Sequence, residues 1–161
     1  MHSSIFEISH SPIPVERRAR AGNLPDWFYE QVCHYAENPG PGRRETAIQA
    51  LSNVLGPHCV RERDRLLLSP KIRESFFRRS YLCFKAAAEA LAQTEYPVFA
   101  GISPSAAFPL ALSGLNESYE EPHGIYIYST EHGTLVTLER WLRHAELSQP
   151  FYLGGTIYYH C

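Results

Sequence analysis

Cysteine and histidine stand side by side at three places in the sequence, and their side chains are typical zinc ligands and nucleophile–base partners. The three pairs are Cys33-His34, His58-Cys59 and His160-Cys161. Adjacent residues point about 100° apart on a helix and to opposite faces of a strand. Zinc ligands that share a turn are usually separated by two to four residues. We therefore expect no metal site and no cofactor, and we interpret the pairs as buried cysteines beside exposed histidines.

Cys59 is the cysteine whose position best suits catalysis. It follows Gly56-Pro57 and His58 at the boundary between two predicted elements, where a neighbouring imidazole would favour the reactive thiolate. Cys33 and Cys83 lie on the apolar stripes of predicted helices, which indicates core positions. No local protease or transferase motif surrounds Cys59. A thiol-dependent hydrolase or transferase that uses Cys59 with a histidine such as His58 is therefore kept as the alternative function.

Carboxylates and imidazoles also meet at Glu120-Glu121 with His123 and at Glu131-His132. Such groups can transfer or orient a proton. Loops and turns carry the same residues for solvation, which is the interpretation we favour here. The sequence has no Gly-x-Ser-x-Gly elbow, no phosphate-binding P-loop, no Rossmann glycine fingerprint and no His-Glu-x-x-His helix. The common versions of those chemistries are excluded.

Positive charge is concentrated in the first half of the chain. Residues 1–85 hold thirteen Lys and Arg against nine Asp and Glu, whereas residues 86–161 hold two against eight. This asymmetry indicates either a basic binding surface or two halves of the chain that face each other.

Five arginines are the candidate nucleic-acid or anion-binding residues. These are Arg61, Arg63, Arg65, Arg78 and Arg79. The first three recur at every second residue and would line one face of a strand, and the last two follow on a predicted helix that also carries aromatic residues. Guanidinium groups suit phosphates, and aromatic rings stack on unpaired bases. No helix-turn-helix, RRM or zinc-finger signature accompanies them, so solvated faces and intramolecular ion pairs remain the alternative.

Tyrosine is frequent on the predicted strands. The tyrosines concerned are Tyr126, Tyr128, Tyr152, Tyr158 and Tyr159. Tyrosine is favoured where one end of a side chain is buried and the other is wet, as at interfaces. If the outer face of the sheet is uncovered, these residues form a contact patch for a protein partner or a second copy of the chain; if helices cover both faces, they are core.

Apolar periodicity and Gly/Pro signals place the elements that carry these residues. Helices are predicted at about 25–36, 44–55, 70–93 and 138–146. Strands are predicted at 5–8, 60–68, 125–129, 134–137, 151–153 and 156–159, with a bulge or bend at Gly154-Gly155. Four prolines interrupt residues 97–124, which we expect to be largely irregular and a candidate lid or binding loop, although a short helix could start at Ser103-Pro104-Ser105-Ala106.

This order of elements predicts an α+β fold: about three to four helices packed on a small, mainly antiparallel sheet that includes a C-terminal hairpin and a final strand. The length of 161 residues and 44% hydrophobic content are typical of a single globular domain, 1–161. No apolar run reaches the roughly 18 residues of a membrane helix, no secretory signal opens the chain, and the four cysteines are scattered. We therefore expect a soluble cytoplasmic protein that does not bind membranes.

The functional hypothesis rests on the absence of catalytic motifs, together with the arginine-rich first half and the tyrosine-rich strands. We expect a non-catalytic interaction or accessory module that binds a protein partner, a like subunit or nucleic acid. The thiol-dependent enzyme at Cys59 is the competing hypothesis.

Overall fold

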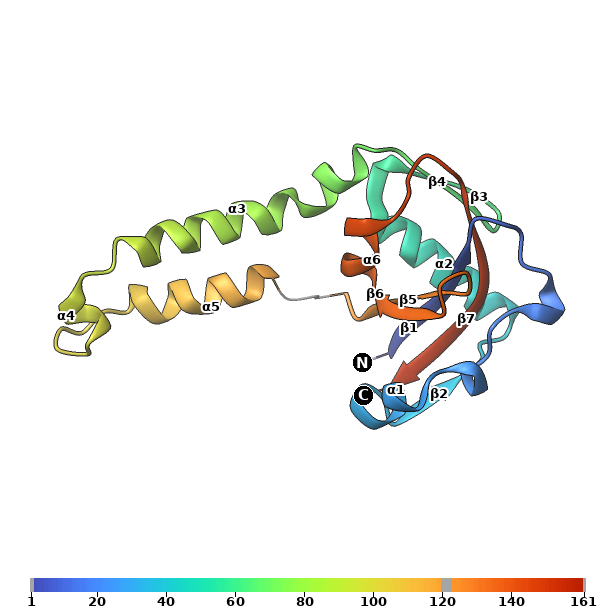
Figure 1. The fold of residues 1–161 in the computed structure, drawn as a ribbon, viewed down its shortest axis with the longest axis horizontal. Helices are drawn as coiled ribbons and strands as arrows, with labels where there is room; N and C mark the ends of the chain where they lie inside the picture. Colours follow the sequence, from blue (N-terminus) through green and yellow to red (C-terminus); the bar gives the residue numbers. More distant parts are fainter. Residues whose placement is uncertain (1, 120–122, 161) are drawn as a thin grey trace. The chain divides into compact units, whose positions relative to one another are not determined.

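Seven β-strands form one open sheet in the part of the chain that this computed structural model describes, residues 2–119 and 123–160 (Figure 1). The strands are β1 (His2–Ser9), β2 (Tyr35–Glu37), β3 (Cys59–Glu62), β4 (Arg65–Leu68), β5 (Ile125–Ser129), β6 (Thr134–Thr137) and β7 (Phe151–His160). Their order is β3-β4-β7-β1-β5-β6, and β2 also pairs with β7. The pair β1–β5 is parallel and the other pairs are antiparallel. The sheet is thus mixed, not wholly antiparallel, because the long chain between β1 and β5 allows a crossover.

Six α-helices accompany the sheet in the described residues, so the predicted number of three to four was too low. They are α1 (Asp26–Gln31), α2 (Pro41–Leu55), α3 (Ile72–Ala92), α4 (Tyr96–Phe99), α5 (Ala107–Tyr119) and α6 (Leu138–His144). Four of them have seven residues or more. None of these helices is both long and apolar enough to cross a membrane. The predicted α+β class is confirmed.

The chain divides into two compact units. The sheet unit consists of residues 1–72 and 121–161, and the helical unit consists of residues 73–120. The sheet unit holds every strand together with α1, α2 and α6, and the helical unit holds most of α3 together with α4 and α5. The prediction of one domain spanning 1–161 is not decided by this division and stays a prediction.

Three predicted elements differ from the structure, each through contacts that are distant in sequence. The helix predicted at 25–36 ends at Gln31, because Tyr35–Glu37 pair with the last residues of β7. The strand predicted at 60–68 is a tight hairpin of β3 and β4, which turns at Arg63 with a left-handed φ of 57°. The segment 97–124 is not largely irregular, because α5 occupies Ala107–Tyr119 and tolerates Pro109 in its first turn.

Aromatic side chains form much of the core of the sheet unit. The ring of Phe28, fully buried on α1, packs edge-on against Tyr126 at 5.1 Å and Tyr159 at 5.2 Å between centroids. Ile5 and Ile157, on the neighbouring strands β1 and β7, complete this cluster. The helix α1 therefore covers part of the sheet through Phe28.

The bulge expected at Gly154-Gly155 is present. Phe6 pairs with Thr156 and Ile8 with Leu153, so the two glycines face the single residue Glu7. The carboxylate of buried Glu7 accepts hydrogen bonds from the backbone N–H of Ala19 (2.7 Å) and of Gly155 (2.6 Å). A Cβ at Gly155 would overlap the carbonyl of Ala19. Glycine is needed here because the connector after β1 crosses directly over the bulge.

Candidate functional site

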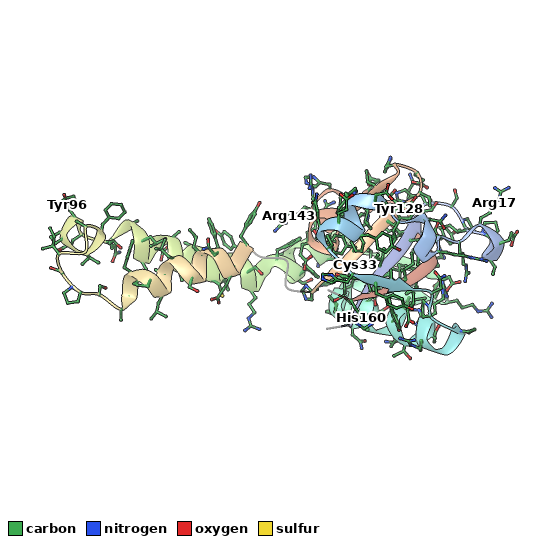
Figure 2. The ribbon with its side chains drawn as sticks, turned by 90° about the horizontal axis from the view of Figure 1, so that it is seen from below. Arg17, Cys33, Tyr96, Tyr128, Arg143 and His160 are labelled. Atoms are coloured by element: carbon green, nitrogen blue, oxygen red, sulfur yellow. The ribbon has the colours of Figure 1, made fainter. Side chains whose placement is uncertain are left out.

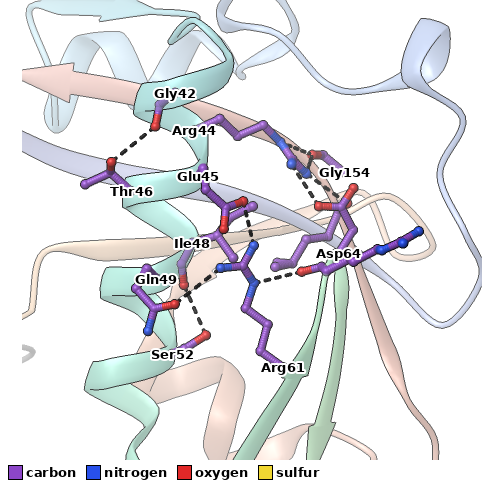
Figure 3. Close-up of polar contacts among 12 residues, drawn as sticks. Gly42, Arg44, Glu45, Thr46, Ile48, Gln49, Ser52, Arg61, Asp64 and Gly154 are labelled. Atoms are coloured by element: carbon purple, nitrogen blue, oxygen red, sulfur yellow. Dashed lines mark hydrogen bonds and ion pairs between the residues drawn. The ribbon is translucent and has the colours of Figure 1, made fainter.

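The three arginines of the β3–β4 hairpin do not form an open basic face. The guanidinium of Arg61 pairs with Glu45 on α2 at 2.7 Å and donates to the carbonyl of Arg63 at 2.7 Å (Figure 3). Arg65 pairs with Glu62 at 3.0 Å. Because the chain reverses at Arg63, the period-two arrangement predicted for one strand does not exist. Two of these three guanidinium groups are thus engaged within the protein.

Two other arginines, Arg18 and Arg44, form ion pairs with Asp64 in the turn of the same hairpin. Asp64 accepts from Arg44 at 2.8 Å, and Arg44 also donates to the carbonyl of Gly154 at 2.8 Å (Figure 3). Arg18 also donates to Asp64, at 2.7 Å. Burial of Asp64 alone would raise its pKa, but the hydrogen bonds and charges of Arg44 and Arg18 outweigh this and lower the pKa of that carboxyl. These ion pairs have a structural role.

The remaining two candidate arginines lie on α3, in the helical unit. Arg78 is 3.4 Å from Glu74, one turn earlier, and Arg79 has no ion pair among the described residues. The five arginines therefore divide between the two units, and three of them are paired with neighbouring carboxylates. Their predicted binding of nucleic acid stays a prediction.

Cys59 lies partly buried at the start of β3. Burial raises the pKa of its thiol to about 11, and this exceeds the lowering by Arg61 and by a hydrogen bond with Ser52. No hydrogen bond joins the His58 imidazole to this thiol within the described residues. The thiol is protonated near neutral pH, so the alternative of a Cys59 nucleophile gains no support.

The other cysteines of the three pairs are placed differently. Cys33 is buried beside exposed His34, as expected. Cys83 is exposed, although the periodicity of α3 predicted a core position. Cys161 lies outside the described residues. Among those residues, no group of three or more His, Cys, Asp or Glu is arranged to hold a metal ion.

The strand tyrosines are largely part of the packing in the sheet unit. Tyr159 is buried, and Tyr126 and Tyr128 pack half-buried against the same core cluster. The hydroxyl of Tyr158 donates to the carbonyl of Arg43, whose guanidinium lies 4.6 Å from the tyrosine ring centroid. Tyr152 and Tyr158 are also half-buried, so none of the five tyrosines is fully exposed. The contact patch predicted for a partner stays a prediction.

His123 and Glu131 each contact a group other than the neighbour in the sequence. His123 Nδ1 lies 2.6 Å from the carboxylate of buried Glu139, which the sequence did not indicate as its partner, while Glu120-Glu121 lie outside the described residues. Glu131 accepts from the Ser9 hydroxyl and from the backbone N–H of His10. These two hydrogen bonds lower the pKa of the Glu131 carboxyl. They bind the β5–β6 turn to the end of β1.

The helical unit has its small side chains inside and many of its large ones outside. Ala87 on α3 and Ala111 on α5 are its only buried residues among those described, at 8% and 9% exposure. A Cβ placed on Gly114 would lie 3.7 Å from that of Ala87. Small residues at this seam allow α3 and α5 to approach closely, so the seam itself buries little apolar surface.

Nine large apolar side chains of this unit are between 42% and 75% exposed. They are Tyr81, Leu82, Phe84, Tyr96, Phe99, Ile102, Leu110, Leu112 and Tyr119. Tyr96 lies at the end of the hairpin where the chain turns from α3 towards α5 (Figure 2). Grooves lined by Phe77, Tyr81 and Leu82 on α3 and by Phe84, Leu115 and Tyr119 between α3 and α5 accompany them. Exposed apolar surface of this extent is typical of interaction sites.

Sequence reasoning missed this surface, although one signal for it is present. Residues 96–116 contain no charged side chain, and the four prolines of 97–124 led us to expect a loop there. The charges that flank this stretch are also distributed unevenly. The basic half of the hairpin, residues 73–85 and 110–119, holds four Lys and Arg against two Glu, and the acidic half, residues 86–109, holds two Glu and no Lys or Arg.

The exposed apolar hairpin of residues 73–119 is thus the most distinctive candidate site. Comparison with known proteins found no matching family model, no matching curated protein and no matching solved structure.

Proposed function

We propose that this protein is a non-catalytic interaction module and that the hairpin of α3, α4 and α5 is its protein-binding element. One observation carries the proposal: large apolar side chains lie on the outside of the hairpin, while alanine and glycine form its seam. A helix normally buries its apolar face against another element. The module is placed in the cytoplasm, as expected from the sequence.

The partner that fits this surface best is the hairpin of a second copy of the chain. A fully buried aromatic side chain covers about 200 Å², so the five exposed aromatic residues present on the order of 600 Å² by the same measure. The four aliphatic residues bring the total close to the ~800 Å² that each partner contributes to a standard interface. Two hairpins together make the four helices of a bundle.

The charges of the hairpin favour an antiparallel pairing of the two copies. The net charge of the basic half is positive, whereas the acidic half carries Glu89 and Glu95 and no Lys or Arg. Within one copy Lys85 of the basic half lies 3.8 Å from Glu89, and Glu95 has no ion pair among the described residues. An antiparallel dimer brings the basic half of each copy beside the acidic half of the other. A parallel dimer would instead place like charges together.

The same charges argue against the other candidate partners. Helices that lie on membranes are rich in Lys and Arg on their polar face, but the uncharged stretch of residues 96–116 is preceded by Glu89 and Glu95. A nucleic-acid partner requires accessible cations, whereas Arg61 and Arg65 of the β3–β4 hairpin are paired with carboxylates.

The oligomeric state tests the proposal. Sedimentation velocity across a concentration series should show the chain of 18.3 kDa associating to a dimer. Leu110→Asp should abolish association with little loss of stability, because this side chain is 70% exposed. Val15→Asp is the matched control, since Val15 is 69% exposed in the sheet unit; this variant should remain dimeric. A purified chain that stays monomeric at every concentration would refute the second copy as partner.

Charge reversal tests the antiparallel arrangement. R78E/R79E reverses the charge of the basic half, and E89R/E95R reverses that of the acidic half. Either change should raise the dimer dissociation constant by roughly tenfold at low salt, because several exposed like charges then face each other. Combining all four changes should restore association, because opposite charges again face each other. If one reversal leaves association unchanged, the copies do not pair antiparallel. Circular dichroism of each variant checks that its helices are intact.

A further inference from the structure

A cleft in the sheet unit lies where the two parallel strands end. The strands β1 and β5 are adjacent and parallel, so their last residues, Ser9 and Ser129, lie at the same edge of the sheet. Both residues line a cavity of about 290 Å³. In open sheets that contain parallel strands, ligands bind in crevices at the carboxyl ends of those strands.

The apolar part of the cleft is a set of contacting aromatic rings. The His10 ring lies 4.5 Å from that of Phe151, and Trp141 on α6 meets Phe151 edge-on at 5.0 Å between centroids. All three residues line the cavity. Aromatic side chains of this kind provide flat apolar walls against which a planar ring packs.

Each carboxylate in the cleft accepts a hydrogen bond within the protein through one of its oxygens. The Glu131 carboxylate accepts from the Ser9 hydroxyl at 2.8 Å and from the His10 N–H at 2.7 Å. The Glu146 carboxylate accepts from the N–H of Ser148 at 3.0 Å. His10 Nδ1 lies 3.1 Å from the carbonyl of Pro150, which can only accept, so this nitrogen carries the proton.

Three other groups in the cleft lack such hydrogen bonds among the described residues, although one of them, His132, interacts electrostatically with Glu131. The guanidinium of Arg140 and the imidazoles of His132 and His144 line the cavity and make no hydrogen bond to any residue that the structure describes. A guanidinium is always charged and presents a planar set of N–H donors that matches carboxylate or phosphate oxygens. Within the described residues the Arg140 guanidinium therefore has no acceptor, although the carboxylates of Glu131 and Glu146 also line the cavity.

We infer that this cleft binds a small organic anion in which a carboxylate or phosphate is attached to a planar ring. Arg140 binds the acidic group, with His132 and His144 beside it, and the ring packs against Trp141. The volume is at the lower limit for ligand pockets, so it suits one or two fused rings. This site lies wholly in the sheet unit and does not depend on association through the hairpin.

Calorimetric titration with four probes of similar shape tests the inference. Benzoate and phenyl phosphate should bind the purified protein, whereas benzyl alcohol and benzylamine should bind at least tenfold more weakly, because they lack the anionic acceptors. The stronger of the two anions identifies which acidic group the site prefers. Equal binding of the neutral alcohol, or no binding of either anion, would overturn the inference.

Two variants of neighbouring residues on α6 locate the site. Arg140→Gln should weaken binding of the preferred anion by roughly tenfold or more, while its stability stays near that of the wild type because this side chain is exposed. Arg143→Gln is the matched control, since Arg143 does not line the cavity. Nuclear magnetic resonance should show anion-dependent shifts of the His132 and His144 imidazoles. An Arg140→Gln variant with unchanged affinity would refute the assignment.

Discussion

Replacing Gly155 by alanine should destabilise the sheet unit far more than its small size suggests. The added methyl group would overlap the Ala19 carbonyl, which belongs to the backbone and cannot rotate away. Overpacking of this kind costs about 1–3 kcal/mol. Displacing the connector also weakens the 2.7 Å hydrogen bond from Ala19 to the Glu7 carboxylate, a bond to a charged group worth roughly 1.5–3 kcal/mol. We expect a loss of about 2.5 kcal/mol in the free energy of unfolding, taking both contributions at their lower end.

Urea and thermal denaturation followed by circular dichroism measure this loss. For a chain of this size the melting temperature should fall by about 10 °C. Gly42→Ala is the matched control: nothing lies within 4 Å of its added Cβ, and alanine on α2 should raise the free energy of unfolding by about 0.5 kcal/mol.

A double-mutant cycle with Glu7→Gln tests the proposed mechanism of the loss. The two effects should be non-additive, because both substitutions act on the same contact between the connector and the bulge. A Gly155→Ala protein within about 0.5 kcal/mol of wild type, the usual effect of a neutral surface change, would refute the close crossing of the connector over β7.

Three further predictions concern single side chains. Phe28→Ala should lower the free energy of unfolding by about 3–5 kcal/mol, because the ring is fully buried against two tyrosines; an unchanged urea midpoint would contradict its place in the core. Asp64→Asn should cost about 1 kcal/mol at neutral pH, since the carboxyl is over a third exposed. Its folded pKa is lowered, so the stabilisation exists above the pKa of the unfolded chain and should disappear as the pH falls below about 4. Finally, Cys59 should react with iodoacetamide much more slowly than exposed Cys83 at neutral pH, and its rate should climb until the pH approaches 11; mass spectrometry showing equal rates would contradict the protonated thiol.

Local patterns in the sequence were sufficient to predict several structural elements. The alternation at 125–129 and 134–137 predicted the hairpin that β5 and β6 form, and Gly154-Gly155 predicted the bulge in β7. Such features depend on residues close together in the chain, so the spacing of apolar residues and the residue types in the turns predict them.

Elsewhere local patterns were misleading because distant segments compete for the same residues. Tyr35–Glu37 continue a helical pattern, yet they form β2 because the end of β7 offers backbone hydrogen bonds. Phe76 and Cys83 follow the predicted apolar stripe of α3, but Phe76 is only half-buried and Cys83 is exposed. Periodicity shows which residues share a face of a helix, and it does not show whether another element covers that face.

The candidate sites show the same difference between what local patterns predict and what tertiary contacts determine. The residue types and their order were enough to predict the α+β class, and they contain the arginine-rich first half and the uncharged stretch of residues 96–116. Tertiary contacts were needed to show that Arg61 and Arg65 are paired, that the hairpin has large residues outside, and that β1 and β5 end side by side at a cleft. Residue types determine which hydrogen bonds, ion pairs and apolar contacts a chain can make. Which of these groups find a partner inside the protein, and which stay exposed for another molecule, depends on the pairing of segments that lie far apart in the chain.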